Sequence, residues 1–180
     1  MKRINVVGTS ASGKSTFSKA LAQQLHLTYI ELDDLFWLDD WQESSDQAFF
    51  KKLQQKIDQA SDGYIIDGNY TRTKQIKWKD IDTIIWLDLP FHVNVYRAVK
   101  RAIYRAVSKQ KLWNSSNNQE TFKKLFSRES IILWMMKTHR KNRKQYLEMM
   151  QSNEWSHIHW IRLRSVNDIH HFLEKHHKPK

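Results

Sequence analysis

The chain contains no cysteine, and that absence excludes three kinds of site. Without thiols there is no disulfide framework, no thiolate zinc site and no cysteine nucleophile. Any metal ion must therefore be held by oxygen or imidazole ligands. Long apolar stretches are missing as well: no run of about 18 apolar residues occurs, so the sequence has no candidate transmembrane helix.

Targeting signals and linkers are also lacking. The N-terminus, MKRINVVG, has neither the long apolar stretch nor the small-residue cleavage site of a signal peptide, so we expect a cytoplasmic protein with no membrane partner. No linker rich in Pro, Gly or Ser and no internal repeat occurs, so we expect one domain over residues 1–180. A hydrophobic content of 40% is ample to fill its core.

The net charge of +11 is concentrated in one internal segment, residues 97–144. That segment has 14 Lys and Arg against 2 Asp and Glu, whereas residues 1–96 have 11 against 13 and residues 145–180 have 5 against 4. Basic residues along the whole chain would favour a nucleic-acid binder. A concentrated block beside a phosphate-binding motif favours a clamp on phosphoryl groups, and both alternatives stay open.

A phosphate-binding loop is present near the start of the chain. The stretch GTSASGKS, residues 8–15, matches G-x-x-x-x-G-K-[ST] at every fixed position. Its glycines let successive backbone N–H groups face one anion, Lys14 reaches the β- and γ-phosphates, and Ser15 offers a hydroxyl to Mg²⁺. We therefore predict that ATP is bound by Gly8, Thr9, Ser10, Ala11, Ser12, Gly13, Lys14, Ser15 and Thr16.

The hydrophobic pattern predicts strands that alternate with helices, which indicates an α/β fold with a parallel sheet. Strands are expected at residues 4–8, 27–33, 63–70, 82–90 and 157–163. Helices are expected at residues 14–25, 46–59, 92–107, 120–126, 131–150 and 166–177. Because residues 108–118 are polar and lie between basic helices, we expect them to form a mobile, hinge-like part of a lid.

Acidic residues follow two of the expected strands, at the edge where ligands bind in open α/β sheets. Asp33 and Asp34 end the second strand, where a carboxylate can accept a proton from an acceptor hydroxyl; alternatively they cap the next helical turn. Asp67 ends the third strand and is a candidate for the Mg²⁺ site, or else an ordinary Asp-Gly turn residue. Because two adjacent aspartates would repel an anion, the sequence favours a hydroxyl acceptor.

Arginines supply the candidate phosphate clamp. Arg97, Arg101 and Arg105 are spaced four residues apart and so share one helical face. Like charges at that spacing repel each other, and a ligand with several negative oxygens would compensate them; the alternative is a solvated face with acidic partners. We expect Arg97 and Arg101, with Lys14 and Asp33, to be catalytic and Arg105 to contact substrate.

Other side chains are candidate substrate contacts or surface residues. Trp37 follows the acidic strand end and could stack on the substrate. Asp33 and Asp34 could bind polar groups of the same substrate. Arg72 could offset the repulsion between those aspartates and an anionic acceptor. Arg140 and Arg143 form a similar but weaker pair on a later helix, for which a solvated surface is the favoured interpretation.

The chain resembles the DNA topology modulation proteins, which are P-loop relatives of adenylate kinases. The resemblance is carried by five stretches: GTSASGKST, IELDDLFW, YIIDGNY, DTIIWLDLP and LFSRESIILWMMKTHRKNRKQY. The likeness covers nearly the whole chain. It implies a nucleoside-monophosphate-kinase-like fold, in which helices flank a five-stranded parallel sheet and a helical lid, here about residues 97–144, follows the fourth strand. By the same resemblance, Asp67 lies near Mg²⁺, and Arg97 and Arg101 grip the transferring phosphoryl group.

The chain departs from adenylate kinases after the third strand. There the family continues to an arginine that is displaced by one residue in this chain, at Arg72, which weighs against AMP as the acceptor. We therefore expect an ATP- and Mg²⁺-dependent kinase of a small acceptor, such as a nucleoside, a nucleotide or a similar metabolite. The alternative is a nucleotide-regulated protein that binds nucleic acid through residues 97–144.

Overall fold

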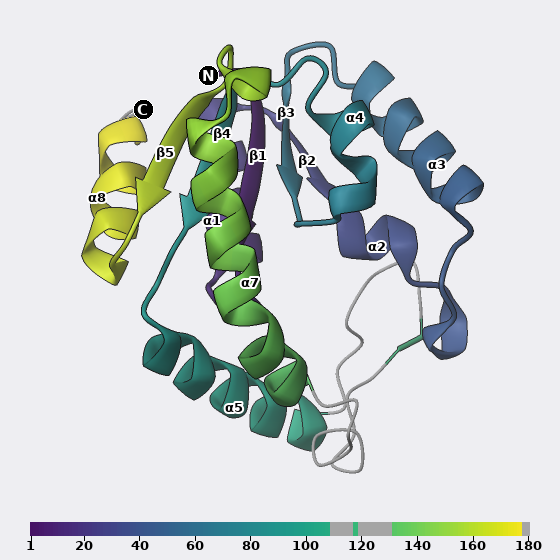
Figure 1. The fold of residues 1–180 in the computed structure, drawn as a ribbon. Coiled ribbons are helices and arrows are strands. Elements are labelled where there is room, and N and C mark those ends of the chain that lie inside the picture. Colours follow the sequence, from purple (N-terminus) through teal and green to yellow (C-terminus); the bar gives the residue numbers. More distant parts are fainter. Residues whose placement is uncertain (109–116, 119–130, 178–180) are drawn as a thin grey trace.

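Five parallel strands form one sheet in the order β2-β3-β1-β4-β5 (Figure 1). The computed structural model describes residues 1–108, 117–118 and 131–177, and for residues 105, 106, 108 and 131–137 it describes the backbone alone. The strands are β1 (Arg3–Gly8), β2 (Thr28–Glu31), β3 (Tyr64–Asp67), β4 (Thr83–Leu87) and β5 (His159–Leu163). The predicted α/β class with a five-stranded parallel sheet is therefore confirmed.

Helices connect the strands at nearly the expected places. They are α1 (Lys14–Leu25), α2 (Leu32–Phe36), α3 (Asp46–Asp58), α4 (Lys74–Lys77), α5 (Phe91–Ser108), α7 (Ile131–Gln151) and α8 (Val166–His176). The described residues also form short 3₁₀ turns, namely η1 (Asp39–Trp41), η2 (Thr71–Thr73) and η3 (Asn153–Trp155). The expected helix at 120–126 lies outside the described residues, as does most of the expected hinge at 108–118.

Side chains of the inner strands alternate between two hydrophobic cores, one on each face of the sheet. In β4, Ile84 and Trp86 belong to the core that contains Tyr146 of α7, whereas Ile85 and Leu87 belong to the core that contains Phe17 of α1. The first core also receives α3, and the second receives α8. Figure 1 shows α7 crossing one face of the sheet. In the described part of the chain, every helix is too short or too polar to cross a bilayer.

The carboxyl ends of the strands meet at one edge of the sheet, because all five strands are parallel. In the centre, Val6 of β1 lies opposite Asp67 of β3 on one side and Ile85 of β4 on the other. Helix α5 lies below this edge in Figure 1. The phosphate-binding loop therefore emerges between the ends of β3 and β4.

The end of the second strand differs from the prediction in a way that affects the site. Strand β2 ends at Glu31, so Asp33 and Asp34 lie in the first turn of α2 and not at the end of the strand. The backbone turns here because Leu32, Leu35 and Phe36 are buried together, which a continued strand with alternating faces could not achieve.

Candidate active site

Two glycines shape the loop between β1 and α1. Gly8 has φ +155°, and a Cβ there would come 2.7 Å from the carbonyl oxygen of Leu87, so only glycine fits. Gly13 has φ +94° and precedes α1 without a side-chain cap. The N-terminus of α1, with its partial positive charge, is thus directed at the loop, as an anion site requires.

Lys14 is half-buried at the start of α1, and its side chain points back to the loop. Its Nζ donates to the carbonyl oxygen of Thr9 at 3.3 Å. Burial lowers the pKa of Lys14, whereas the carboxylates of Asp67 and Asp33 oppose that shift. A phosphate bound beside this ammonium would favour its charged form in the same way, so Lys14 fits the predicted role.

Unpaired polar atoms at the site test whether its residues fit a nucleotide and a metal ion. Within the described residues, Ser12 Oγ and Asp67 Oδ1 are buried without a hydrogen-bond partner. Burial raises the pKa of Asp67, and Lys14 and the Ser15 hydroxyl counteract this effect. An oxygen without a partner beside a hydroxyl is the donor set that Mg²⁺ accepts.

The protein alone does not form a complete metal site. Among the described residues, no group of three or more His, Asp or Glu could hold an ion. Ser15 and Asp67 therefore fit Mg²⁺ only when phosphate oxygens and water complete its coordination, which is how Mg²⁺ binds at nucleotide sites.

Two arginines of α5 contact the phosphate-binding loop. Arg97 Nη1 donates to the carbonyl oxygen of Ser12 at 3.2 Å, and Arg101 Nη2 donates to Ser10 Oγ at 3.2 Å. They share a helical face, as their spacing predicts. The side chain of Arg105 lies outside the described part of the chain.

On the other side of the loop lies a carboxylate of α2. Asp33 Oδ1 accepts a hydrogen bond from Tyr70 Oη at 2.6 Å, and Asp33 is near enough to Lys14 to affect its pKa. Burial and Asp33 both raise the pKa of Tyr70, so the phenol remains a donor. Asp34 is half-buried in the same turn. The structure thus brings Asp33 to the phosphate-binding loop.

Aromatic side chains surround this carboxylate. Trp37 is half-buried, with its ring 5.0 Å from that of Phe36 and 5.7 Å from that of Trp41. Arg72 lies 4.6 Å above the Phe36 ring and pairs with Asp46 at 2.8 Å. The charge of Arg72 is therefore already matched within the protein.

Sequence reasoning missed two residues that hold the phosphate-binding loop. The side-chain amide of Asn69 makes two hydrogen bonds with the backbone of Gly8, and His139 Nδ1 of α7 lies 3.2 Å from Thr9 Oγ1. Asn69 could have been found had the pairing of β1 with β3 been known. His139 is 130 residues from its partner, and no local pattern indicates such a contact.

Arg143 is exposed on α7, as expected, but it also contacts an acidic side chain that the sequence did not indicate. Its Nε lies 3.2 Å from the carboxylate of Asp88, which follows β4, and Arg162 of β5 binds the same carboxylate. Helical spacing could not predict the pair of Arg143 with the buried Asp88, because the two residues are 55 positions apart in the sequence. Arg143 thus joins α7 to the sheet instead of facing solvent alone.

Comparison with known proteins places the chain among P-loop proteins. A family model described as an AAA domain matches residues 4–124. The uncharacterized protein YqaC of Bacillus subtilis (strain 168) is 25% identical over 104 residues, 58% of each chain. A shikimate kinase of Sulfurihydrogenibium sp. (strain YO3AOP1) is 28% identical over 103 residues, 49% of this chain and 61% of that protein. The chain thus spans about six tenths of the length of these relatives.

Solved structures share the fold over nearly the whole chain. A shikimate kinase from Acinetobacter baumannii in complex with shikimate has a TM-score of 0.57 at 12% identity and covers 97% of this chain and 90% of its own. A sugar kinase from Janibacter sp. HTCC2649 has a TM-score of 0.54 at 14% identity, covering 97% and 91%. A gluconokinase from Sinorhizobium meliloti 1021 has a TM-score of 0.53 at 12% identity, and the match covers 98% of this chain and 89% of the gluconokinase. Identities this low show the fold alone.

Proposed function

The chain belongs to the AAA domain family, and from that membership and the site geometry we propose that it is a Mg²⁺- and ATP-dependent kinase of a small hydroxyl acceptor. One observation carries the proposal: three cations contact the phosphate-binding loop, and the carboxylate of Asp33 is near enough to one of them, Lys14, to affect its pKa. Lys14, Arg97 and Arg101 contact the loop itself. Asp33 approaches Lys14 from α2, at the place an acceptor would occupy.

The cationic side of the site would hold the triphosphate. Backbone N–H groups of the loop and Lys14 bind its oxygens, and Arg97 and Arg101 neutralise the charge that develops on the γ-phosphoryl group. Ser15 and Asp67 would hold Mg²⁺, which supplies further positive charge to the phosphate oxygens. Catalysis on this scheme consists of positioning and electrostatic stabilisation.

The carboxylate side would activate the acceptor. Tyr70 orients Asp33 through its hydrogen bond to Oδ1. Asp33 then accepts the proton of the acceptor hydroxyl, while that oxygen forms the new bond to the γ-phosphorus and the bond from phosphorus to ADP breaks.

The charge of the acceptor side favours a hydroxyl over a phosphate acceptor. Asp33 and Asp34 both lie in the first turn of α2, and Arg72, which lies over the Phe36 ring of the same helix, is paired with Asp46. A nucleoside monophosphate would meet repulsion in such a place, so transfer of the adenylate-kinase type to AMP is the less favoured variant. The structural neighbours are kinases named for shikimate, sugar and gluconate, which supports a small-molecule acceptor.

Replacing the proposed base tests this function. We expect Asp33→Asn to lower turnover by roughly 10²–10⁴-fold, the usual contribution of a general base, with little change in ATP affinity. The measurement follows ADP release and phosphorylated product for a panel of nucleosides, nucleotides and small alcohols with Mg²⁺-ATP. Calorimetry on the same variant gives its ATP affinity.

A matched control is Asp62→Asn, because Asp62 is exposed and precedes β3 at the opposite end of the sheet. This variant should keep full turnover. Undiminished turnover of Asp33→Asn would remove Asp33 from the chemistry, and simultaneous loss of ATP binding would make it part of the nucleotide site.

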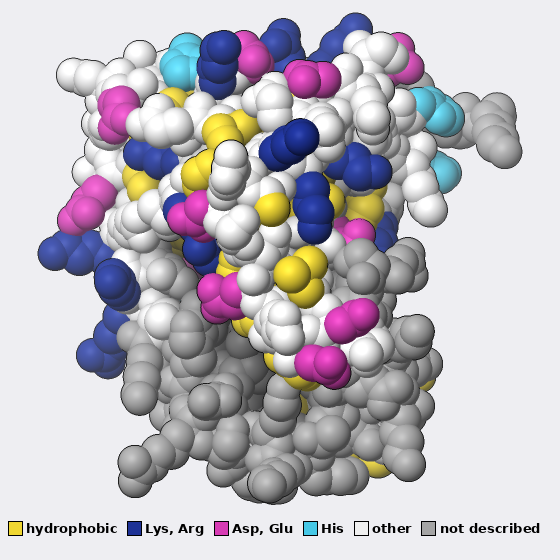
Figure 2. Space-filling view, turned by 90° about the vertical axis from the view of Figure 1, so that its right-hand side faces the viewer, with side chains coloured by type: hydrophobic (Ala, Val, Ile, Leu, Met, Phe, Trp, Pro, Cys, Tyr) yellow, Lys and Arg dark blue, Asp and Glu magenta, His cyan; other side chains and the backbone are white. Residues whose placement is uncertain are grey.

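The nucleic-acid alternative, suggested by the resemblance to DNA topology modulation proteins, is less well supported. Three arginines of the basic segment, Arg97, Arg101 and Arg143, have partners within the protein. On the face shown in Figure 2, described basic and acidic side chains are interspersed. A duplex-binding surface would instead gather cations along one continuous face.

A further inference from the structure

Lys77 is a buried lysine whose described partners include no carboxylate. It is 1% exposed, and its Nζ donates to the carbonyl oxygens of Asn69 at 2.8 Å and Gly68 at 3.4 Å. Burial lowers the pKa of Lys77 to about 7. Burial removes the hydration of an ammonium group, and the two carbonyl oxygens replace only part of it.

The turn that Lys77 contacts carries Asn69, which binds the first residue of the phosphate-binding loop. Gly8 N donates to Asn69 Oδ1 at 3.0 Å, and Asn69 Nδ2 donates to Gly8 O at 2.8 Å. These bonds extend the pairing of β1 with β3 beyond its last backbone pair, Val6 with Asp67. The position of Asn69 therefore sets where the loop leaves the sheet.

A second buried donor holds the same turn from beneath. Asn5 Nδ2 donates to Gly68 O at 3.2 Å and to Ile66 O at 2.9 Å, and Trp78 Nε1 donates to Asn5 Oδ1 at 2.8 Å. The Gly68 carbonyl thus accepts from both Asn5 and Lys77. A connected buried network of this kind favours one arrangement of the turn.

We propose that Lys77 is a positioning residue for the phosphate-binding loop: it fixes the Gly68–Asn69 turn, and Asn69 in turn fixes Gly8. The contacts connect Lys77 through Asn69 to Gly8, which precedes Thr9, and the carbonyl oxygen of Thr9 accepts a hydrogen bond from Lys14. The inference deepens the proposed function and rests on it, because it takes the loop to be a nucleotide site.

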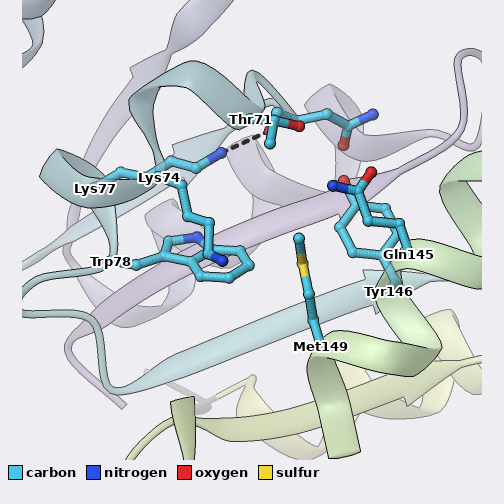
Figure 3. Close-up of a pocket in the computed structure, with 8 residues that line it drawn as sticks. Thr71, Lys74, Lys77, Trp78, Gln145, Tyr146 and Met149 are labelled. Carbon is cyan, nitrogen blue, oxygen red and sulfur yellow. Dashed lines mark hydrogen bonds between the residues drawn. The ribbon is translucent and has the colours of Figure 1, made fainter. Parts of the chain in front are cut away.

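A neighbouring lysine provides a matched control. Lys74 and Lys77 both border the hollow between α4 and α7, but Figure 3 shows Lys77 reaching toward the turn and Lys74 lying beside the ring of Trp78. Lys74 Nζ is 5.3 Å from the centre of that ring and 3.7 Å from the Glu154 carboxylate. It makes no described contact with Asn69 or Gly8.

The test compares Lys77→Met with the wild type in two measurements. Hydrogen exchange followed by NMR should be about tenfold faster at the Gly8 amide of the variant and unchanged at the other amides of β1. Calorimetry should show an affinity for Mg²⁺-ATP about tenfold weaker. Lys74→Met should match the wild type in both. A general loss of stability would instead accelerate exchange along the whole strand.

A double-mutant cycle tests the route through Asn69. Asn69→Ala should weaken Mg²⁺-ATP binding, and the double variant should bind no more weakly than the poorer single variant, because both substitutions break the same chain of contacts. Independent, multiplying effects would contradict that route. Lys77→Gln retains a side-chain donor and should fall between the wild type and Lys77→Met.

Other outcomes would contradict either the positioning role of Lys77 or the proposed function. Unchanged Gly8 exchange in a folded Lys77→Met protein would overturn the proposal, and failure of both Lys77 variants to fold would show that Lys77 serves the fold and not the loop. If the wild type binds no Mg²⁺-ATP, the proposed function fails. Local loss of Gly8 protection would then still support the positioning role.

Discussion

At the scale of single residues, the site depends on where buried charge is placed. Lys14 provides the sole side-chain cation within residues 8–16. Burial disfavours its charged form, the carboxylates of Asp67 and Asp33 oppose that effect, and a bound anion would favour the charged form further. The same side chain therefore costs stability in the free protein and contributes affinity in the complex.

We expect Lys14→Ala to lose about a hundredfold or more in affinity for Mg²⁺-ATP, because a charge-assisted contact to phosphate disappears. Its fold should be retained, since the substitution removes a half-buried ammonium and no core side chain. Calorimetric titration gives the affinity, and circular dichroism verifies the fold. Lys19→Ala on the same helix is the control, because Lys19 is exposed and pairs with Glu31. Equal affinity in the two variants would refute the site.

At the scale of elements, α7 and α5 bring distant residues to the phosphate-binding loop. Helix α7 brings His139 to Thr9, and burial lowers the pKa of His139. The same helix is joined to the sheet through Arg143 and Asp88, with Arg162 of β5 as the second partner of that carboxylate. The ion triad thus holds the helix against the strand ends.

Removing members of this triad should destabilise the protein in a definite order. Arg162→Met should lower the free energy of unfolding by about 2 kcal/mol, because it removes charged hydrogen bonds to the buried carboxylate of Asp88. Arg143→Met should cost about 1 kcal/mol or less, since Arg143 is half exposed. Urea unfolding measures both. Arg140→Met, at an exposed position on α7, should have almost no effect, and equal losses in all three would contradict the order.

At the scale of the whole molecule, Lys77 links global stability to pH. Its pKa is about 7 in the folded protein and 10.5 in a model peptide. Between these values the unfolded chain binds a proton that the folded chain does not, so stability rises with pH across that window. Below pH 7 both states are protonated, and the cost of the buried ammonium no longer changes.

The stability of the wild type relative to Lys77→Met should therefore increase from pH 7 to pH 9, by roughly 2 kcal/mol. Urea unfolding of both proteins at pH 6, 7, 8 and 9 provides the comparison, and other titrating groups cancel in the difference. Lys74→Met should run parallel to the wild type. If the difference in free energy of unfolding between the wild type and Lys77→Met stays constant with pH, Lys77 does not titrate in this range.

Features that depend on residues close together in the chain could be predicted before the structure was known. The phosphate-binding loop is a local motif, because its backbone shape follows from Gly8 and Gly13 and its charge from Lys14. Periodicity predicted most helices and strands, and their alternation predicted the parallel sheet, because burial on the faces of a sheet imposes those patterns. The common helical face of Arg97 and Arg101 followed from their spacing for the same reason.

Tertiary structure alone decided how these pieces meet. The strand order brings β3 beside β1, and that pairing places Asn69 on Gly8 and Asp67 near Lys14. Packing also decided that Lys77 is buried and that Arg72 pairs with Asp46. Local propensity carries no information about such contacts, since each joins residues that are distant in sequence or depends on which neighbours exclude water.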